Sequence, residues 1–375
     1  MNSMRVLFVT NVPAPYKRPR LNRLADFDDI NLLVYYTNAS TQRHEYKDLP
    51  DPQFTFIQGK SQNFSIGKKE LMVGLIPRRV VSRFSPDVFI VGGWNHLAAW
   101  QVLIASKYYG KPIGIISANI NQGKISRTIL TNLLPLFDKY FSLSKSSEEN
   151  FRSMGVSESD IVTLPNGIDV DAFRKSISQE KQVNIKERYG ISTGPLVTYV
   201  GNLEHDKGVQ DLISAVSQVG EKVQLLIVGD GPKKQDLVEQ AKSANIRAIF
   251  TGIIPNSELS NFYSVSDLVA LPTYHDTWGL VINEALACGT PVISTTAAGA
   301  SGEILIDGKN GFITKPGDIE NLSNCILKIL TSDKLRAEFG DYGREISNNY
   351  TPEKYATELR SEMYKMSNHH STNIS

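Results

Sequence analysis

Short apolar runs alternate with amphipathic segments along most of the chain. The runs in the first half are continuous rather than alternating, which is typical of parallel strands buried on both faces. Helical patterns lie between several of them; the pattern over Leu97–Tyr109, for example, stops at Gly110-Lys111-Pro112. The predicted strands of this half are Arg5–Thr10, Ile30–Tyr36, Phe54–Ile57, Val88–Gly92, Ile113–Ser117, Tyr140–Leu143 and Ile161–Leu164.

The same alternation begins again after a polar, charged stretch in the middle of the chain. We therefore predict two α/β domains, over residues 1–178 and 179–375, joined by a linker near Ser176–Val183. A late helical pattern at Glu353–Met366 is expected to cross back onto the first domain. The predicted strands of the second half are Pro195–Gly201, Val223–Gly229, Ile246–Phe250, Leu268–Leu271, Pro291–Ser294 and Gly311–Thr314.

Each domain is expected to be a doubly wound, Rossmann-like parallel sheet with helices on both faces. In such open sheets, ligands bind at the carboxyl ends of the strands. Two such sheets facing each other leave an interdomain cleft, which is a preferred place for small-molecule ligands. Functional residues are therefore expected in the loops that follow the strands.

The composition is that of an ordinary globular protein, with 41% hydrophobic and 21% charged residues among 375. No segment has the apolar core of a signal peptide or the roughly 20 apolar residues of a transmembrane helix. The two cysteines, Cys288 and Cys325, have no metal-ligand spacing, and they predict no disulfide scaffold. A cytoplasmic location fits these features.

The net charge of +1 conceals an uneven distribution. Residues 1–175 hold 22 Lys and Arg against 15 Asp and Glu, a balance of +7, whereas residues 176–375 hold 18 against 24, a balance of −6. A basic first half suits an anionic lipid or a diphosphate-bearing acceptor, although chance surface charge is an equal alternative. The basic residues form no stripe interleaved with aromatic ones, so no nucleic acid partner is expected.

The densest chemical signal is the stretch 271–293, which reads LPTYHDTWGLVINEALACGTPVI. A strand ends at Leu271, a polar loop follows, and a helix is predicted to begin near Gly279. The N–H groups of Gly279, Leu280 and Val281 lie at the start of this helix, where the helix dipole is positive. They predict a binding site for an anion such as a phosphate group.

Two carboxylates flank the start of this helix. Glu284 lies about a turn and a half into the helix, where it can accept two hydrogen bonds from a ribose diol. Asp276 lies in the preceding loop, where it can reach the hydroxyl groups of a sugar. A strand, loop and helix that merely pack together would explain Ala285 and Leu286, but not the two carboxylates.

In these residues the chain resembles the retaining glycosyltransferases of family 4, which have the two-domain GT-B fold. Their signature is an acidic residue, seven further residues and a Glu, followed by Ala and a small-Cys-Gly turn into a strand. Asp276, Glu284 and Ala285-Leu286-Ala287-Cys288-Gly289 match it, although the first acid is usually Glu. The resemblance implies a nucleotide-sugar donor, with Glu284 on the ribose and Asp276 on the transferred sugar. It covers nearly the whole chain and is strongest from Val197 to Gly317.

The second signal is the stretch Tyr199–Val209, in which a strand and a glycine turn lead to a helix start at Lys207. The resemblance places Gly201 and Asn202 in the donor site, with Lys207 neutralising the diphosphate as the sugar leaves. The family usually has Arg at the position of Asn202, so one expected cation is missing. A solvated lysine at a helix start is the alternative for Lys207.

Two further turns match the nucleotide site of the family. Gly229 begins a Gly-Asp-Gly-Pro turn after a strand, although such turns are also common outside binding sites. Ile253 follows the next strand, where relatives cradle the base through backbone groups. Because such contacts depend little on side chains, the base is not identified, and UDP is expected only because it is commonest among relatives.

The first domain is expected to bind the acceptor. The loop after the first strand holds Pro15 and Tyr16, next to basic residues, and resembles an Asn-x-Pro-x-Pro-Tyr-Arg loop of some relatives. Asn119 lies near the end of the fifth strand, where relatives often have a catalytic His. His96, at the end of the fourth strand, is a candidate substitute. A rigid proline turn and a structural His are the alternatives.

The segment 64–84 places basic residues among apolar ones. This pattern predicts a basic amphipathic helix, kinked at Pro77, that could rest on an anionic membrane. A solvated basic face is the alternative. The basic residues are Lys68, Lys69, Arg78, Arg79 and Arg83.

The resemblance implies a retaining, metal-independent glycosyltransferase that requires no cofactor. It would move a sugar from a nucleotide diphosphate sugar to a glycan or lipid-linked acceptor in cell-surface polysaccharide or glycoconjugate synthesis. One alternative is a sugar-nucleotide epimerase of the same fold, which would turn over the donor without an acceptor. Another is a binding protein that has lost catalysis. Asp169-Val170-Asp171 has the form of a metal-chelating motif, but Asp169 is expected to cap a helix instead.

Overall fold

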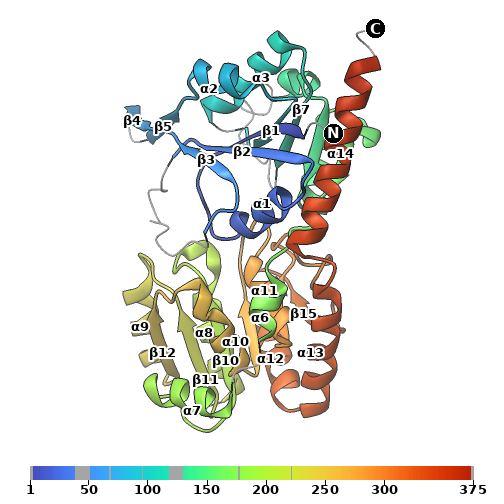
Figure 1. Cartoon of the computed structure of the whole chain (residues 1–375). Helices are drawn as coiled ribbons and strands as arrows, with labels where there is room; N and C mark the ends of the chain where they lie inside the picture. Colours follow the sequence, from blue (N-terminus) through green and yellow to red (C-terminus); the bar gives the residue numbers. More distant parts are fainter. Residues whose placement is uncertain are drawn as a thin grey trace. The chain divides into compact units, whose positions relative to one another are not determined.

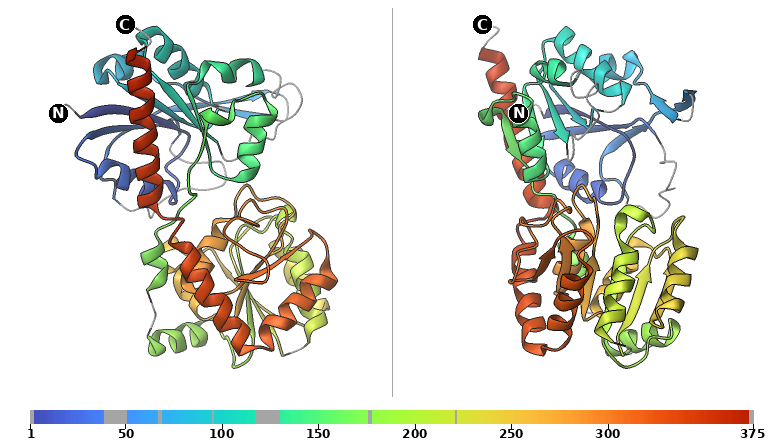
Figure 2. Two further views of the ribbon diagram at one scale, coloured as in Figure 1. Left: turned by 90° about the vertical axis from the view of Figure 1, so that its right-hand side faces the viewer. Right: turned by 180° about the vertical axis from the view of Figure 1, so that it is seen from behind.

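The computed structural model describes residues 3–38, 51–66, 69–94, 96–117, 130–175, 178–220 and 222–372, without the side chains of 61–73 and 370–372. The chain forms two compact units, residues 1–167 with 351–375 and residues 168–350 (Figure 1). Each unit contains one parallel sheet with helices on both faces, which confirms the doubly wound α/β class (Figure 2). Every predicted strand overlaps an observed one.

The first unit has a seven-stranded parallel sheet. In spatial order its strands are β3 (Thr55–Gln58), β2 (Ile30–Tyr36), β1 (Met4–Thr10), β6 (Val88–Gly92), β7 (Ile113–Ser117), β8 (Lys139–Ser142) and β9 (Ile161–Thr163). Its helices are α1 (Lys17–Ala25), α2 (Arg78–Phe84), α3 (Leu97–Tyr109), α5 (Lys145–Ser153) and α14 (Pro352–Thr372), with 3-10 turns η1 (Leu134–Leu136) and η2 (Glu158–Asp160).

Alternate residues of β1 explain the layers of this unit. Val6 and Phe8 pack on one face with residues of α1 and α14, while Leu7 and Val9 pack on the other face with residues of α2 and α3. Burial on both faces is the reason that the strand is a continuous apolar run in the sequence.

An antiparallel hairpin corrects the expectation of a helix over 64–84. β4 (Ser61–Ile66) and β5 (Lys69–Gly74) pair with each other, and among the described residues of this segment only α2 is helical. Gly74 and Pro77 are poor residues for a helix interior, so the segment divides into shorter elements. Pro77 does not kink a helix but is the N-cap residue of α2, with an extended backbone.

The final helix packs on the first unit, beside α1 (Figure 1). Leu359 and Met363 are fully buried in the core that contains Phe8. Arg360 Nε donates to Asp29 Oδ1 at 2.9 Å, and the Tyr364 hydroxyl donates to Asp29 Oδ2 at 3.0 Å. The chain therefore passes between the units twice, after Gly167 and after Tyr350.

The second unit has a six-stranded parallel sheet. In spatial order its strands are β12 (Arg247–Gly252), β11 (Gln224–Val228), β10 (Leu196–Val200), β13 (Leu268–Leu271), β14 (Val292–Thr295) and β15 (Gly311–Thr314). Its helices are α6 (Val170–Arg174), α7 (Gln179–Arg188), α8 (Val209–Val219), α9 (Lys234–Ser243), α10 (Leu259–Ser264), α11 (Leu280–Cys288), α12 (Ile319–Leu330) and α13 (Asp333–Ser347), with 3-10 turns η3 (His205–Lys207) and η4 (Asn256–Glu258).

The second unit begins before the predicted linker. Ile168, Val170 and Phe173 are buried in its core, so α6 belongs to it. The Asp169 side chain accepts the N–H of Ala172 at 3.0 Å and caps α6, as expected from the sequence.

In each sheet, successive strands are added first toward one edge and then toward the other, and this change occurs at a single switch point. This switch point lies between β1 and β6 in the first unit and between β10 and β13 in the second. Loops diverge there at the carboxyl ends of the two strands and leave a crevice, which is the usual ligand site of open α/β sheets.

We predict that α14 is required for the stability of the first unit. Leu359→Ala should lower its free energy of unfolding by about 2–5 kcal/mol, because it leaves a cavity in the core. Glu358→Ala, one residue earlier on the exposed face, should change it by no more than about 0.5 kcal/mol. Denaturant unfolding followed by fluorescence measures both, since Trp94 and Trp100 lie in this unit. Equal effects of the two substitutions would contradict the packing described.

Candidate functional site

Two loops are joined at the switch point of the second unit. The backbone N–H of Tyr274 donates to Asp206 O at 2.8 Å, and Thr273 Oγ1 donates to the same oxygen at 3.0 Å. Gly208 has a φ of +70°, and a Cβ at this position would lie 2.0 Å from Pro272 O. The loop after β10 can therefore approach the loop after β13 this closely only with glycine at position 208.

This approach brings two predicted residues together. Lys207 Nζ donates to Asp276 Oδ2 at 2.9 Å and to His275 O at 3.1 Å. The other carboxylate oxygen of Asp276 accepts the N–H of Trp278 at 3.2 Å. The side chains of Lys207 and Asp276 are 20% and 24% exposed, so both remain accessible to a ligand. The ion pair joins two sequence signals that lie 69 residues apart.

The start of α11 has the form of an anion site. Gly279, with a φ of +90°, is the N-cap residue, and no side chain in the described part of the chain caps the helix. The N–H groups of Leu280 and Val281 lie in the first turn, where the helix dipole is positive. The structure thus has the local geometry that the sequence predicts, and the role of these groups stays a prediction.

Glu284 is buried in the middle of α11, with 8% of its surface exposed. The Tyr263 hydroxyl donates to Glu284 Oε2 at 2.6 Å. Burial raises the pKa of Glu284 from 4.5 to about 7, and the hydrogen bond from Tyr263 opposes this shift. The carboxyl group therefore exchanges a proton near neutral pH. Tyr263 is a partner that sequence analysis missed, because it lies on α10 outside any motif.

The other residues predicted to bind the sugar donor lie at the carboxyl ends of strands in the same sheet. Gly201 N donates to Val228 O at 3.0 Å, and Gly229 N donates to Gly252 O at 2.9 Å, so three neighbouring strand ends are joined. Asn202 is half-buried, and its backbone oxygen accepts the Tyr199 hydroxyl at 2.8 Å. Ile253 follows β12 and is exposed. These residues share one edge with Lys207 and Asp276.

The acceptor-side residues lie in the first unit. Pro15 and Tyr16 belong to the loop after β1, and Tyr16 is exposed. His96 is buried at the start of α3, where its Nδ1 accepts the N–H of Ala99 at 3.2 Å. This contact caps α3 through one ring nitrogen, and the acceptor-side role of His96 stays a prediction. Asn119 lies outside the described residues.

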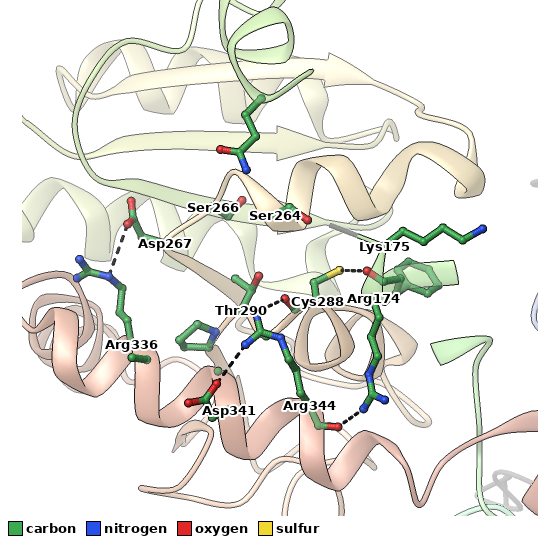
Figure 3. Close-up of a pocket in the computed structure, with 16 residues that line it drawn as sticks. Arg174, Lys175, Ser264, Ser266, Asp267, Cys288, Thr290, Arg336, Asp341 and Arg344 are labelled. Atoms are coloured by element: carbon green, nitrogen blue, oxygen red, sulfur yellow. Dashed lines mark hydrogen bonds and ion pairs between the residues drawn. The ribbon is translucent and has the colours of Figure 1, made fainter. Parts of the chain in front are cut away.

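A polar pocket of about 540 Å³ lies at the opposite edge of the second sheet (Figure 3). Asp267 and Pro291 line it just before β13 and β14, so it faces the amino ends of these strands. Arg344 Nη2 donates to Cys288 O at 3.1 Å, and Arg336 Nε lies 3.6 Å from Asp267 Oδ1. These arginines already have carbonyl and carboxylate partners, and the pocket is separate from the candidate site.

Within the described ranges, no group of three or more His, Cys, Asp and Glu side chains is placed to hold a metal ion. None of the helices in these ranges combines the length and apolar character needed to cross a membrane. Cys288 and Cys325 are free thiols.

We predict that Glu284 makes the stability of the second unit depend on pH. Because its pKa is raised on folding, the folded protein holds a proton between about pH 4.5 and 7 that the unfolded chain releases. Its stabilising contribution is therefore complete below pH 4.5 and is lost as the pH rises through 7. Relative to wild type, Glu284→Gln should gain on the order of 3 kcal/mol in free energy of unfolding between pH 4 and 8.

Denaturant unfolding across this pH range measures the effect. Tyr263→Phe is the matched variant: it removes the bond that lowers the pKa of Glu284, so the loss of stability should extend to higher pH. A difference between wild type and Glu284→Gln that stays constant with pH would contradict the burial of an ionisable carboxyl group.

The chain is similar to known proteins in sequence and in fold. Residues 181–346 match the family described as "Glycosyl transferases group 1". Sulfoquinovosyl transferase SQD2 of Arabidopsis thaliana is 32% identical over 201 residues, which are 53% of this chain and 38% of that protein. N-acetyl-alpha-D-glucosaminyl L-malate synthase of Bacillus anthracis is 29% identical over 212 residues, 55% of this chain and 54% of that protein. The matches thus span less than two thirds of these relatives.

The fold has close counterparts among solved structures. The crystal structure of Anabaena HepE in complex with UDP has a TM-score of 0.78 at 20% identity, over 96% of this chain and 100% of that one. This likeness supports the GT-B fold that the sequence motifs predict. Residues 181–346, which make up most of the second unit, are thus similar to the glycosyl transferases group 1 family.

Proposed function

We propose that this chain is a retaining glycosyltransferase that moves a sugar from a UDP-sugar to a glycan or lipid-linked acceptor, in cell-surface polysaccharide or glycoconjugate synthesis. The observation that carries the proposal is the meeting of Lys207, Asp276 and the start of α11 at one switch point. The names of the matched relatives describe a sugar transferase and a glucosaminyl conjugate synthase, and the HepE structure contains UDP. They support a nucleotide-sugar donor.

In this proposal the diphosphate of the donor lies at the start of α11. The N–H groups of Leu280 and Val281 donate to its oxygens, and Lys207 supplies a positive charge as negative charge develops on the leaving group. Asp276 holds Lys207 Nζ at 2.9 Å, so the cation is positioned before the reaction begins. Because these groups supply the positive charge, the proposed reaction needs no metal.

Asp276 and Glu284 bind the other two parts of the donor in this proposal, the transferred sugar and the ribose. Asp276 keeps lone pairs beyond its bonds to Lys207 and Trp278, and with these it can accept a sugar hydroxyl. Ionised Glu284 accepts the ribose diol alongside the Tyr263 hydroxyl. In front-face attack the leaving phosphate takes the proton of the acceptor, so the configuration at the anomeric carbon is retained without a separate base.

Calorimetric titration with UDP, GDP and ADP tests the donor site. We expect UDP to bind, and Glu284→Ala to weaken its affinity roughly tenfold to hundredfold, the range for a lost hydrogen bond to a charged group. Glu320→Ala, an exposed change on α12, should bind UDP as wild type does. The affinity of wild type should rise as the pH increases through 7, because the ionised Glu284 accepts both hydroxyl groups.

The outcomes of this titration separate the alternatives. Binding of none of the three nucleotides, or unchanged UDP binding by Glu284→Ala, would refute the proposed donor site. Turnover of the donor in the absence of an acceptor would identify the epimerase. UDP binding without transfer to any acceptor tested would identify the binding protein that has lost catalysis.

We also propose that residues 64–84 of the first unit contact the cytoplasmic face of an anionic membrane. The α2 arginines Arg78, Arg79 and Arg83 are exposed, and α2 and α3 contain no acidic residue. On α3, Ile104 and Tyr108 are 71% and 76% exposed. Exposed apolar side chains beside arginines are the combination that binds the interface of an anionic bilayer.

Vesicle sedimentation tests this contact. The protein should sediment with vesicles that contain phosphatidylglycerol and not with phosphatidylcholine alone. Arg79→Gln with Arg83→Gln should weaken binding roughly tenfold to thirtyfold, at about 1 kcal/mol for each arginine. Lys334→Gln, an exposed change in the second unit, is the control. Equal binding to both kinds of vesicle would contradict the electrostatic contact.

A further inference from the structure

The switch point of the first unit holds a second group of basic side chains. Thr10 ends β1 and Lys17 begins α1, while Gly92 ends β6 and His96 precedes α3. Lys17 Nζ donates to Thr10 Oγ1 at 2.9 Å, and Thr10 Oγ1 donates to Gly92 O at 3.4 Å. These contacts connect the two strand ends between which the sheet reverses direction, the place where open α/β sheets bind ligands.

His96 has a buried donor without a partner. Because its Nδ1 accepts the N–H of Ala99, that nitrogen carries no proton, and the neutral ring has its proton at Nε2. The side chain is 6% exposed, and Nε2 makes no hydrogen bond of standard geometry with the described residues, although a backbone interaction with Gly92 acts to raise the pKa of the ring. A buried N–H without an acceptor costs free energy, so a group that brings an oxygen to Nε2 would be stabilised there.

The charged groups around this donor are basic. Burial and the charge of Arg20 lower the pKa of Lys17 to about 7, and burial and the charge of Lys17 lower the pKa of His96 to about 4. No carboxylate of the described residues contributes to either shift. The guanidinium group of Arg20, which acts on Lys17, is buried; it lies over the Tyr355 ring and donates to the neutral oxygens of Gly167 and Asn166, and no described carboxylate forms an ion pair with it. Enclosed positive charge without a counter-charge is costly and favours an anion.

The two switch points differ in this respect. In the second unit, Lys207 has the carboxylate of Asp276 as its partner. Lys17 instead donates to the neutral oxygens of Thr10, Asn11 and Val12, which use its three N–H bonds but leave its charge uncompensated. Lys17 would therefore act on a ligand through its charge, and His96 Nε2 through a direct hydrogen bond.

We propose that Lys17 and His96 form a binding site for an oxyanion, a phosphate or carboxylate group carried by the acceptor. His96 Nε2–H donates to one of its oxygens, Lys17 supplies positive charge, and the start of α3 adds the positive end of a helix dipole. The assignment to the acceptor rests on the proposed function, which places the donor diphosphate in the second unit. A negatively charged acceptor would then be preferred over its neutral analogue.

Titration with methyl phosphate and with acetate tests the site. The protein is saturated with UDP, and the Nε2 signal of His96 is followed in long-range ¹H–¹⁵N spectra. We expect a saturable shift of this signal with at least one anion and none with glucose. Lys17→Met should weaken the anion roughly tenfold or more, whereas Lys107→Met, a lysine on α3 that pairs with Asp138, should not.

A second variant keeps the test independent of folding. His96→Asn retains an oxygen that can cap Ala99 N–H but removes the ring N–H, so it should fold and lose the anion. Anion affinity of Lys17→Met and His96→Asn equal to that of wild type would overturn the proposal. The absence of any shift with either anion would also overturn the proposal, and an ordered water would then be the partner of Nε2.

The affinity for UDP shows whether the bound oxyanion belongs to the acceptor or to the donor diphosphate. Unchanged UDP affinity in Lys17→Met assigns the oxyanion to the acceptor, whereas a matching loss of UDP affinity assigns it to the donor diphosphate. If UDP does not bind at all, the proposed donor site fails, and the titration is repeated without UDP on Lys207→Met. Anion binding in that protein that is lost on adding Lys17→Met still supports the oxyanion site.

Discussion

The close contact between Gly208 and Pro272 is the constraint on which the candidate donor site depends. It lets the loop after β10 lie against the loop after β13, and the hydrogen bonds to Asp206 O hold the two loops in that position. Lys207 belongs to the first loop and Asp276 to the second, so their ion pair is a consequence of backbone packing. A side chain at position 208 would separate the loops, and the cation and the carboxylate with them.

Helix α11 combines an open end with a buried centre. Its first turn has uncapped N–H groups in the described structure, while Glu284 is enclosed and bonded to Tyr263. At the other end, Arg344 donates to Cys288 O and fixes the last turn. Burial, followed by the charge of Glu284, raises the pKa of Cys288 to about 12, so this thiol stays protonated at neutral pH. The helix is thus held firmly at the end away from the proposed diphosphate.

The sequence predicted the elements better than their contacts. Strands such as Ile30–Tyr36 and Val88–Gly92 were predicted with their observed bounds, because burial on both faces leaves an uninterrupted apolar run. The β4–β5 hairpin was not predicted, because short apolar runs in a basic segment also fit a helix.

Within the candidate site, too, the sequence predicted local elements better than contacts between distant residues. The start of α11 follows from Gly279, whose positive φ suits an N-cap without a side chain. The pairing of Lys207 with Asp276 depends on strand order across 69 residues, which local pattern does not contain. Tyr263 and the unpartnered Nε2 of His96 depend on packing between elements, and no motif marks them.

The placement of α14 has a consequence for the order in which the protein is made. The core of the first unit includes Leu359 and Met363, so this unit cannot be completed until residues 351–375 have left the ribosome. Residues 168–350 form one uninterrupted stretch and have all of their core before that time. The second unit can therefore fold first during synthesis, while one face of the sheet of the first unit is covered only in part, by α1.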